Sequence, residues 1–556
     1  MASGGAVGRR RVVFVVRPSS CGVLMSEVSS SAQSPGPAPG PSAASGPAPA
    51  SGNRADWQPL LDDLTRRRSA SRAMGGPAKV ARYSAAGRLH ARARVDALLD
   101  PGSFTELGTL AGGADAPSDA FVAGSGRIDG RPVFVGAEDF TVQGGSIGPA
   151  AAAKRARLAR LAGQERAPLV MLLEGAGHRA TNALQGHTAS PNDLQALTEL
   201  AGVVPTVAVV TGPSAGHGAL TAPLSDFVVM VEGAGALFTA GPPLVAAAIG
   251  ERVDKLTLGG TDVHCVASGV AHNAAADDRA ALRLVRRYLS YLPSNAWQHP
   301  PFAGAGQGNA DTGPRSTDAV LDLIPPDARR PYDMHAVLDT VFDARSVLEI
   351  QPAYGASVLT AFARLGGHAV AVVANQPAVR AGTIDADAAS KAARFVEVCG
   401  AFHLPVVFLA DNPGVLAGTV SERAGILRAS ARLFAAQHRL RVPKLHVTLR
   451  KAFGFGSSVM AMNPFDAQTI SYALPGVTLG GIPAAAGAAT AKQDAETRDR
   501  LVANESSGPW RSANSLSYDD VIDPRELRNA LLAGLDRAAA RTAEPPTPVT
   551  RVGYLP

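Results

Sequence analysis

The sequence contains little cysteine, few aromatic residues and no long apolar run. Its three cysteines among 556 residues, at positions 21, 265 and 399, are too few and too scattered for a disulfide framework or a zinc site. A reducing cytoplasm suits such a chain. Five apolar residues follow the arginines at positions 9–11, fewer than the ~7–15 of a signal peptide, and no stretch reaches the ~18 residues of a membrane span. We expect a cytoplasmic protein with no membrane segment and no metal.

Positive charge is in small excess and is not gathered where a nucleic acid could bind. The formal net charge is +6, and half of it comes from the four arginines and one glutamate of residues 1–50. The rest is spread over the remainder of the chain. No stripe of lysine and arginine interleaved with aromatic residues is present. A nucleic-acid partner is therefore not expected.

Length and composition divide the chain into a tail and two domains. Residues 1–52 consist largely of serine, alanine, proline and glycine, so we expect a disordered, dispensable tail and hypothesise a translation start at Met25. The remaining residues are too many for one hydrophobic core, which rarely exceeds ~250–300 residues. A proline- and glycine-rich stretch predicts a linker at residues 306–318, between domains at residues 53–305 and 319–556.

The two predicted domains carry one pattern at a nearly constant displacement. Six landmarks recur 237 or 238 positions later, and most of them lie beside an apolar strand or a glycine turn. The first members are Arg127, Gly145, Lys154, Pro168, Val204 and Gly216, and the second members are Arg364, Gly382, Lys391, Pro405, Val442 and Gly454. This agreement indicates an internal duplication rather than two unrelated segments. Each copy alternates short strands with helices, which is typical of an α/β domain.

Four glycine-rich turns lie where strands are expected to pass into helices. They are residues 174–179 and 212–218 in the first copy and residues 411–414 and 451–458 in the second. Small residues let the backbone approach a ligand, and the first N–H groups of a helix lack partners within it. Two N–H groups aimed at one point form an oxyanion hole. One such turn is also explained by tight strand–helix packing, but two at equivalent positions predict two related anion sites.

No side chain is clearly placed for acid–base or hydrolytic chemistry. His217 directly follows Gly216, so either its ring or its backbone N–H could act on a ligand. The chain has no Ser-His-Asp order and no lipase-type serine turn, and its histidines lack the spacing of a metal site. A hydrolase is not predicted.

Several longer motifs resemble the β-type carboxyltransferase subunits of acyl-CoA carboxylases. The resemblance covers the chain from about residue 75 to the C-terminus and keeps the family order. The motifs are GRLHARARV (87–95), LLDPGSF (98–104), DFTVQGGS (139–146), SGVAH (268–272), LSYLPSN (289–295), RPYD (330–333), VANQP (373–377) and KAARF (391–395). Each is short, and together they are specific.

The resemblance implies two tandem crotonase-type α/β domains (ββα spirals) and a biotin-dependent carboxyltransferase. Backbone N–H groups at Gly216 and His217 would hold the acyl-CoA thioester, and those at Phe455 and Gly456 the biotin ureido oxygen. Carboxybiotin would release CO2, the biotin anion would remove the substrate α-proton, and the thioester enolate would attack CO2. Such a mechanism needs oriented donors rather than a dedicated acid–base side chain.

The resemblance also implies further binding residues and partners. We expect Gly145, Ser146, Gly177, Arg179 and Ser458 to contact the acyl-CoA, and Gly414 and Gly454 to contact biotin. The chain lacks a biotin-attachment motif AMKM, so a biotin carboxyl carrier and a biotin carboxylase subunit would be its partners. The family implies a hexamer of three dimers, with each active site between two subunits, so that an isolated monomer is inactive.

The chain departs from the family at its turns, which leaves alternatives open. EGAGHR at residues 174–179 stands where DSGGAR is common, and His217 and Phe455 each replace a common glycine. One alternative is a biotin-independent crotonase-type isomerase or hydratase that uses Glu174 or His217 as acid or base. Another is a non-catalytic structural subunit of a mixed carboxylase complex. For Ser458, a small residue near the acyl chain is weighed against a helix N-cap.

Overall fold

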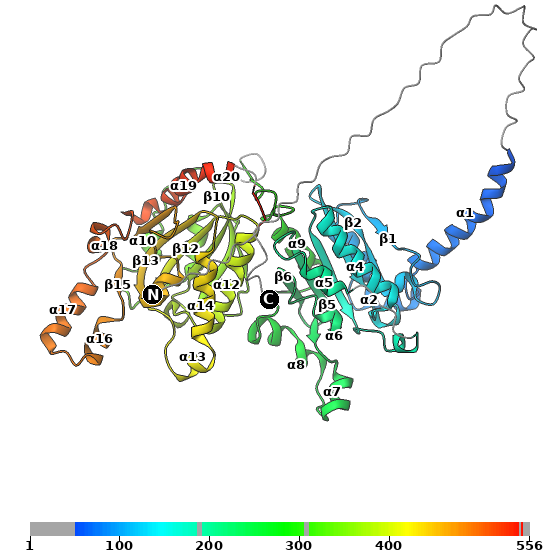
Figure 1. The fold of residues 1–556 in the computed structure, drawn as a ribbon, viewed down its shortest axis with the longest axis horizontal. Coiled ribbons are helices and arrows are strands. Elements are labelled where there is room, and N and C mark those ends of the chain that lie inside the picture. The colour runs from blue at the N-terminus through cyan, green and yellow to red at the C-terminus, as the bar shows by residue number, and fades with distance from the viewer. Residues whose placement is uncertain (1–50, 186–191, 305–310, 544–545, 549–556) are drawn as a thin grey trace, which may run out of the picture. The chain divides into compact units, whose positions relative to one another are not determined.

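The computed structural model describes residues 51–185, 192–304, 311–543 and 546–548. The chain divides after Leu61, and the described part of the first unit is the beginning of helix α1 (Ser51–Arg72). The second unit, residues 62–556, contains the two sheets (Figure 1). Most of the predicted tail, residues 1–50, and the predicted linker up to residue 310 lie outside the described residues.

The first sheet has its strands in the order β1-β2-β3-β4-β5-β6-β8, with β7 paired to β5. β1, β2 and β3 are antiparallel neighbours, and every later neighbour is parallel. The strands are β1 (Thr105–Leu107), β2 (Phe121–Ile128), β3 (Arg131–Glu138), β4 (Leu169–Gly175), β5 (Thr206–Ala215), β6 (Phe227–Val231), β7 (Ala236–Phe238) and β8 (Asn273–Ala275). β4 is buried along its whole length, which explains why its residues 169–173 form a continuous apolar run rather than an alternating one.

The second sheet repeats this order as β9-β10-β11-β12-β13-β14-β16, with β15 paired to β13. The strands are β9 (Leu348–Ile350), β10 (Val358–Leu365), β11 (His368–Asn375), β12 (Val406–Asn412), β13 (Lys444–Phe453), β14 (Ile470–Ala473), β15 (Thr478–Gly480) and β16 (Asp520–Val521). Even the registers agree: Phe121 pairs with Glu138 in the first sheet as Val358 pairs with Asn375 in the second. The predicted fold class, two tandem α/β copies, is confirmed.

Helices connect the parallel strands and also precede or follow each sheet along the chain. In the first half they are α2 (Pro77–Ala85), α3 (Ala91–Leu98), α4 (Pro149–Gln164), α5 (Asp193–Thr198), α6 (Gly216–Ala219), α7 (Pro242–Ile249), α8 (Lys255–Gly259) and α9 (Asp278–Leu289). In the second half they are α10 (Val320–Leu323), α11 (Met334–Val341), α12 (Ala386–Ala401), α13 (Thr419–Arg423), α14 (Ile426–His438), α15 (Gly454–Val459), α16 (Ala484–Thr490), α17 (Ala495–Glu505), α18 (Trp510–Asn514), α19 (Leu527–Arg537) and α20 (Ala539–Ala543). Pro149 begins α4, and the Asp385 side chain caps the equivalent α12 by accepting from the N–H of Ala388, so equivalent helices start by different means.

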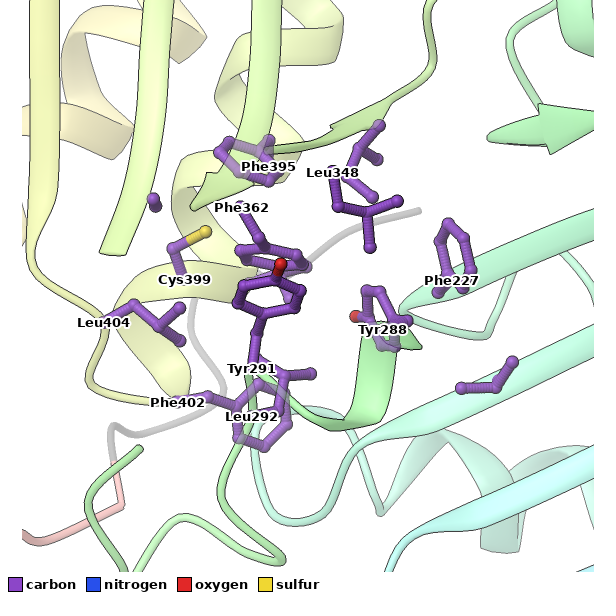
Figure 2. Packing of buried hydrophobic residues seen from close by; sticks show 14 of the residues in the cluster. Phe227, Tyr288, Tyr291, Leu292, Leu348, Phe362, Phe395, Cys399, Phe402 and Leu404 are labelled. Atoms are coloured by element: carbon purple, nitrogen blue, oxygen red, sulfur yellow. The ribbon is translucent and has the colours of Figure 1, made fainter. Parts of the chain in front are cut away.

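One hydrophobic core joins side chains of both halves. Phe227 of the first sheet stacks on Tyr288 of α9 with ring centroids 4.2 Å apart. Tyr288 contacts Phe362 of the second sheet at 5.5 Å, and Phe362 contacts Phe395 of α12 at 5.2 Å (Figure 2). Aromatic pairs at these separations are favourable beyond the area they bury. Where the boundary between the two domains falls remains a prediction.

The described helices include none that could cross a membrane, since none combines sufficient length with sufficient apolar character.

Candidate functional site

The first candidate turn joins strand β5 to helix α6. Ala215 ends the strand in an extended conformation (φ −121°, ψ 149°), and Gly216 follows with φ +55°. This left-handed conformation is readily adopted by glycine and costly for a residue with a side chain. The next residues, His217 and Gly218, lie in α6, where the first N–H groups have no partner inside the helix.

The second candidate turn, between β13 and α15, has nearly the same backbone. Phe453 is extended (φ −122°, ψ 136°) and Gly454 has φ +55°. In both turns the positive φ falls on the glycine, and neither His217 nor Phe455 has one. Glycine is therefore not required at positions 217 and 455 for the backbone conformation. Residues with a side chain can present the same N–H groups there.

A second loop packs against each turn and also requires glycine. Gly177 has φ +79°, and a Cβ added to it would lie 2.6 Å from the carbonyl oxygen of Ala215. Gly414 has φ +120° and its added Cβ would lie 3.5 Å from the carbonyl oxygen of Phe453. A Cβ on Gly456 would lie 2.3 Å from Asn412 Oδ1. The predicted residues Gly177 and Gly414 thus lie directly behind the two turns.

Arg179, Ser146 and Gly145 lie together beside the first turn. Arg179 Nε donates to Ser146 Oγ at 3.1 Å, and its Nη2 donates to the Ser146 carbonyl at 2.9 Å. Its Nη1 forms an ion pair with Asp119 at 2.7 Å. Gly145 lies so close to β4 that an added Cβ would be 2.3 Å from the carbonyl oxygen of Glu174. Arg179 therefore binds groups of its own chain and positions the loops around it.

Glu174 is fixed by two arginines. Arg88 Nη2 lies 2.8 Å from Glu174 Oε1, and Arg94 Nη1 lies 2.6 Å from Oε2. The Glu174 side chain is only 2% exposed. Glu174 also lines the cavity described below, but both of its carboxylate oxygens are paired with arginine, so it is poorly placed to exchange a proton with a substrate.

His217 belongs to a buried ionic network that sequence reasoning did not find. Its Nε2 lies 2.5 Å from Asp193 Oδ1, and Arg155 Nε lies 2.6 Å from Asp193 Oδ2. Arg155 also pairs with Glu138 at 2.9 Å. Burial alone would raise the pKa of Asp193, but the hydrogen bond from His217 and the charge and hydrogen bond of Arg155 lower it to about 2. An ionised Asp193 holds the imidazole of His217 in one orientation, and this restrains the backbone of His217 directly after Gly216.

The second half pairs the equivalent acid differently. Arg450 Nε lies 3.0 Å from Asp411 Oδ2, and the Arg450 guanidinium lies over the Tyr332 ring, 4.9 Å from its centroid. Lys451 Nζ lies 3.5 Å from Asp411 Oδ1. Burial raises the pKa of Asp411, although the charges of Lys451 and Arg450 oppose this.

Ser458 and Phe455 lie on the helix that follows the second turn. α15 begins at Gly454, and its N-cap position is Phe453, so the alternative in which Ser458 caps the helix is wrong. The backbone carbonyl of Ser458 accepts from Gln437 at 3.3 Å. The Phe455 side chain is half-exposed and packs against Phe434 with ring centroids 5.6 Å apart.

A basic cavity of about 640 Å³ lies beside the first turn. Its walls include Gln143 and Gly144, which precede the predicted Gly145, and Pro213 of β5. Its cationic lining residues are Lys79, Arg82, Arg88 and Lys255. Arg88 belongs to the motif at residues 87–95, which was the sequence signal for it, whereas nothing marked Lys79 or Lys255. The cavity is suited in size and charge to a polyanionic small molecule.

The contacts gather the predicted residues into two sets. Gly177 packs against Ala215, which precedes the turn at Gly216 and His217, and Gly145, Ser146 and Arg179 lie on the loops beside Gly177. Gly414 lies behind the turn that contains Gly454, Phe455, Gly456 and Ser458. Within the described residues, no group of three or more His, Cys, Asp or Glu side chains could bind a metal ion. The roles of the two sets remain predictions.

Comparison with known proteins places this geometry in a family. A family model described as the carboxyl transferase domain matches residues 82–552. The chain is 35% identical over 495 residues to the propionyl-CoA carboxylase carboxyltransferase subunit of Haloferax mediterranei, covering 85% of this chain and 95% of that protein. It is 33% identical over 501 residues to the methylmalonyl-CoA carboxyltransferase 12S subunit of Propionibacterium freudenreichii, covering 86% and 94%.

A solved structure shares the fold. It is a transcarboxylase 12S structure with hydrolysed methylmalonyl-coenzyme A bound, described as a hexamer assembly. The TM-score is 0.81 at 32% sequence identity, and the match covers 89% of this chain and 98% of that one.

Proposed function

The chain belongs to the carboxyl transferase family and is a biotin-dependent acyl-CoA carboxyltransferase, and we propose that its two turns divide the work between the two reactants. The turn at Gly216 and His217 would receive the thioester oxygen of the acyl-CoA. The turn at Phe455 and Gly456 would receive the ureido oxygen of biotin. The observation that carries this proposal is the repeated backbone, with φ +55° at both Gly216 and Gly454.

The first half suits a coenzyme A thioester. The cavity beside the turn has four cationic side chains in its lining, and phosphate groups are bound well by lysine and arginine. N–H groups directed at the thioester oxygen would stabilise the negative charge that develops there when the α-carbon loses its proton. His217, oriented by Asp193, would fix the position of its own backbone N–H.

The second half suits a compact uncharged ring. The N–H groups of Phe455 and Gly456 follow Gly454. Gly456 lies so close to Asn412 that a Cβ has no room, so backbone atoms rather than side chains form this part of the turn. The half-exposed Phe455 ring offers an apolar face. Biotin, when bound, supplies the carboxyl group. The two backbone N–H groups and the Phe455 ring fit biotin. They would orient its ring and stabilise the charge on its ureido oxygen.

We further propose the partners and the assembly. Biotin would arrive on a carrier subunit loaded by a biotin carboxylase. The chain would form a hexamer of three dimers, since the related transcarboxylase 12S protein is described as a hexamer, with each active site between the first half of one subunit and the second half of its partner. The acyl group would be propionyl or methylmalonyl, which the names of two relatives support. A cytoplasmic location is supported by the scarcity of cysteine.

The isomerase or hydratase alternative is not favoured. It would require Glu174 or His217 as acid or base. The Glu174 carboxylate is occupied by Arg88 and Arg94, and Nε2 of His217 is occupied by Asp193. The non-catalytic alternative was motivated by the replaced glycines, and the ordinary φ of His217 and Phe455 removes that motivation.

Decarboxylation of methylmalonyl-CoA by the purified chain, with and without free biotin, tests the proposal. We expect turnover that depends on biotin. Turnover without biotin would support an isomerase-type or hydratase-type site, and absence of turnover under both conditions would support a structural subunit.

A further inference from the structure

The two halves differ at three equivalent positions beside the turns. The register that pairs Gly175 with Ser214 recurs as Asn412 with Ala452, so the neighbouring positions also correspond. Glu174, Gly212 and Pro213 of the first half have as their equivalents Asp411, Arg450 and Lys451, respectively. We propose that Lys451 determines which turn receives the coenzyme A thioester, because its side chain crosses to the loop after β11 at the position where, in the first half, Pro213 and Gly144 leave the basic cavity open. This inference rests on the proposed function.

In the first half the Glu174 side chain covers the backbone at Gly212, and the space beside Pro213 stays open. A Cβ on Gly212 would lie 2.4 Å from Glu174 Oε1, so the carboxylate itself covers Gly212 and reaches outward to Arg88 and Arg94. Pro213, the next residue, cannot extend across the loop that contains Gly144. Both Pro213 and Gly144 therefore line the cavity of about 640 Å³.

In the second half two long side chains replace those small residues. The acid Asp411 is one methylene shorter than Glu174, and Arg450 occupies the space beside it. Nε of Arg450 donates to Asp411, and its Nη1 donates to the carbonyl oxygens of Asp327 at 2.9 Å and Arg330 at 2.7 Å. Lys451 extends outward. Its Nζ lies 3.3 Å from the carbonyl oxygen of Ala381, which is the equivalent of Gly144, and 3.5 Å from Asp411 Oδ1.

Lys451 is therefore part of the wall rather than a free surface cation. Its side chain is 10% exposed, and it bridges β13 to the loop after β11. Moving it would leave the fully buried Asp411 with one cation fewer, which is unfavourable for a buried charge. A nucleotide-bearing thioester thus has open space beside the first turn, whereas Lys451 crosses the equivalent space beside the second turn, and biotin does not need that space.

The test is steady-state kinetics with free biotin as the varied substrate at several fixed concentrations of methylmalonyl-CoA. We expect the apparent KM for biotin to be independent of the thioester in the wild-type protein and in Lys451→Met, which keeps the length of the side chain. In Lys451→Ala the thioester becomes competitive with biotin; a second site with a Kd of about 1 mM would raise the apparent KM about twofold at about 1 mM thioester. A folded Lys451→Ala protein without such competition overturns the proposal, and so does equal competition in Lys451→Met.

A reciprocal substitution tests the same idea in the first half. Pro213→Lys introduces the long side chain opposite Gly144, with Glu174 as its acidic partner. We expect a raised KM for methylmalonyl-CoA and an unchanged KM for biotin, and an unchanged KM for both overturns the proposal even if Lys451→Ala fails to fold. Failure of the proposed function is distinguishable, because the wild-type protein would then show no biotin-dependent turnover.

Discussion

At the scale of single residues, the two turns separate the role of the backbone from that of the side chains. Gly216 and Gly454 have the left-handed φ, while His217 and Phe455 supply the next N–H with an ordinary φ. A side chain is thus tolerated at the second position of each turn and costly at the first. The replaced glycines alter what surrounds the N–H groups rather than where they point.

Alanine at neighbouring positions of the first turn checks this division. A Cβ on Gly216 would find its nearest contact, the carbonyl oxygen of Thr239, at 3.5 Å, so Gly216→Ala introduces backbone strain of about 1–2 kcal/mol without a clash. Alanine keeps its N–H, but relief of this strain would turn the N–H groups of the turn away from the thioester oxygen, so we expect kcat to fall by up to about 10²–10³-fold, the loss found when an oxyanion donor is removed. His217→Ala, the matched control, retains its N–H and should lose far less. Equal losses in the two variants would contradict the backbone role.

Ser458 remains a predicted determinant of acyl-chain length. Because α15 begins four residues earlier, at Gly454, Ser458→Ile should not remove a cap. If Ser458 lines the acyl pocket, the variant should change the ratio of kcat/KM between acetyl-CoA and longer acyl-CoAs by an amount equivalent to ~1–3 kcal/mol. Ser457→Ile is the control for added bulk on the same helix. A constant ratio in Ser458→Ile would exclude the specificity role.

The sequence could predict the glycines of the site but not its ion pairs. Gly216 and Gly454 follow apolar strands at repeat positions, so local pattern was enough. Asp193, by contrast, contacts Arg155 and His217 across 38 and 24 positions, and such contacts leave no period in the sequence. Likewise, Glu174 meets Arg88 only through the fold of the second unit.

At the scale of elements, the duplication preserves strand register while changing what packs behind each turn. Both halves have a register shift before the turn, between Leu173 and Gly175 and between Ala410 and Asn412. The constant displacement predicted these elements, because equivalent strands and helices have to keep their lengths to form the same sheet. The displacement could not predict that α4 starts with a proline and α12 with a capping aspartate. Different residues can solve the problem of the unpaired N–H groups at a helix start.

The third residue of each turn shows how the packing differs. A Cβ on Gly456 would lie 2.3 Å from Asn412 Oδ1 and 2.8 Å from Gly414 Cα, whereas a Cβ on Gly218 would lie 3.2 Å from Glu138 Oε1 at its closest. We expect Gly456→Ala to lower the free energy of unfolding by about 1–3 kcal/mol, as overpacking does, and Gly218→Ala to lower it less. Denaturant unfolding monitored by circular dichroism measures both, and a larger loss in Gly218→Ala would contradict this difference in available space.

At the scale of the whole molecule, each half offers one turn, and the proposed reaction needs both. The described contacts gather the predicted residues around two separate turns, one in each half. A closed dimer with twofold symmetry would place the first turn of each subunit opposite the second turn of the other, and would form two active sites. Light scattering of a fully active monomer would contradict this arrangement.

Mixed dimers distinguish sites between subunits from sites within one chain. Gly216→Ala affects only the first turn and Gly454→Ala only the second, so each homodimer should be nearly inactive. A mixed dimer with sites between subunits has one site bearing both substitutions and one site bearing neither. Co-expression of the two variants at equal levels should therefore restore about a quarter of the wild-type activity, since half of the dimers are mixed and half of their sites are intact. If each site lay within one chain, every site would contain a substitution and no activity would return. Isolating mixed dimers through two different affinity tags raises the expected recovery to about one half, and absence of recovery in that fraction would refute the interface.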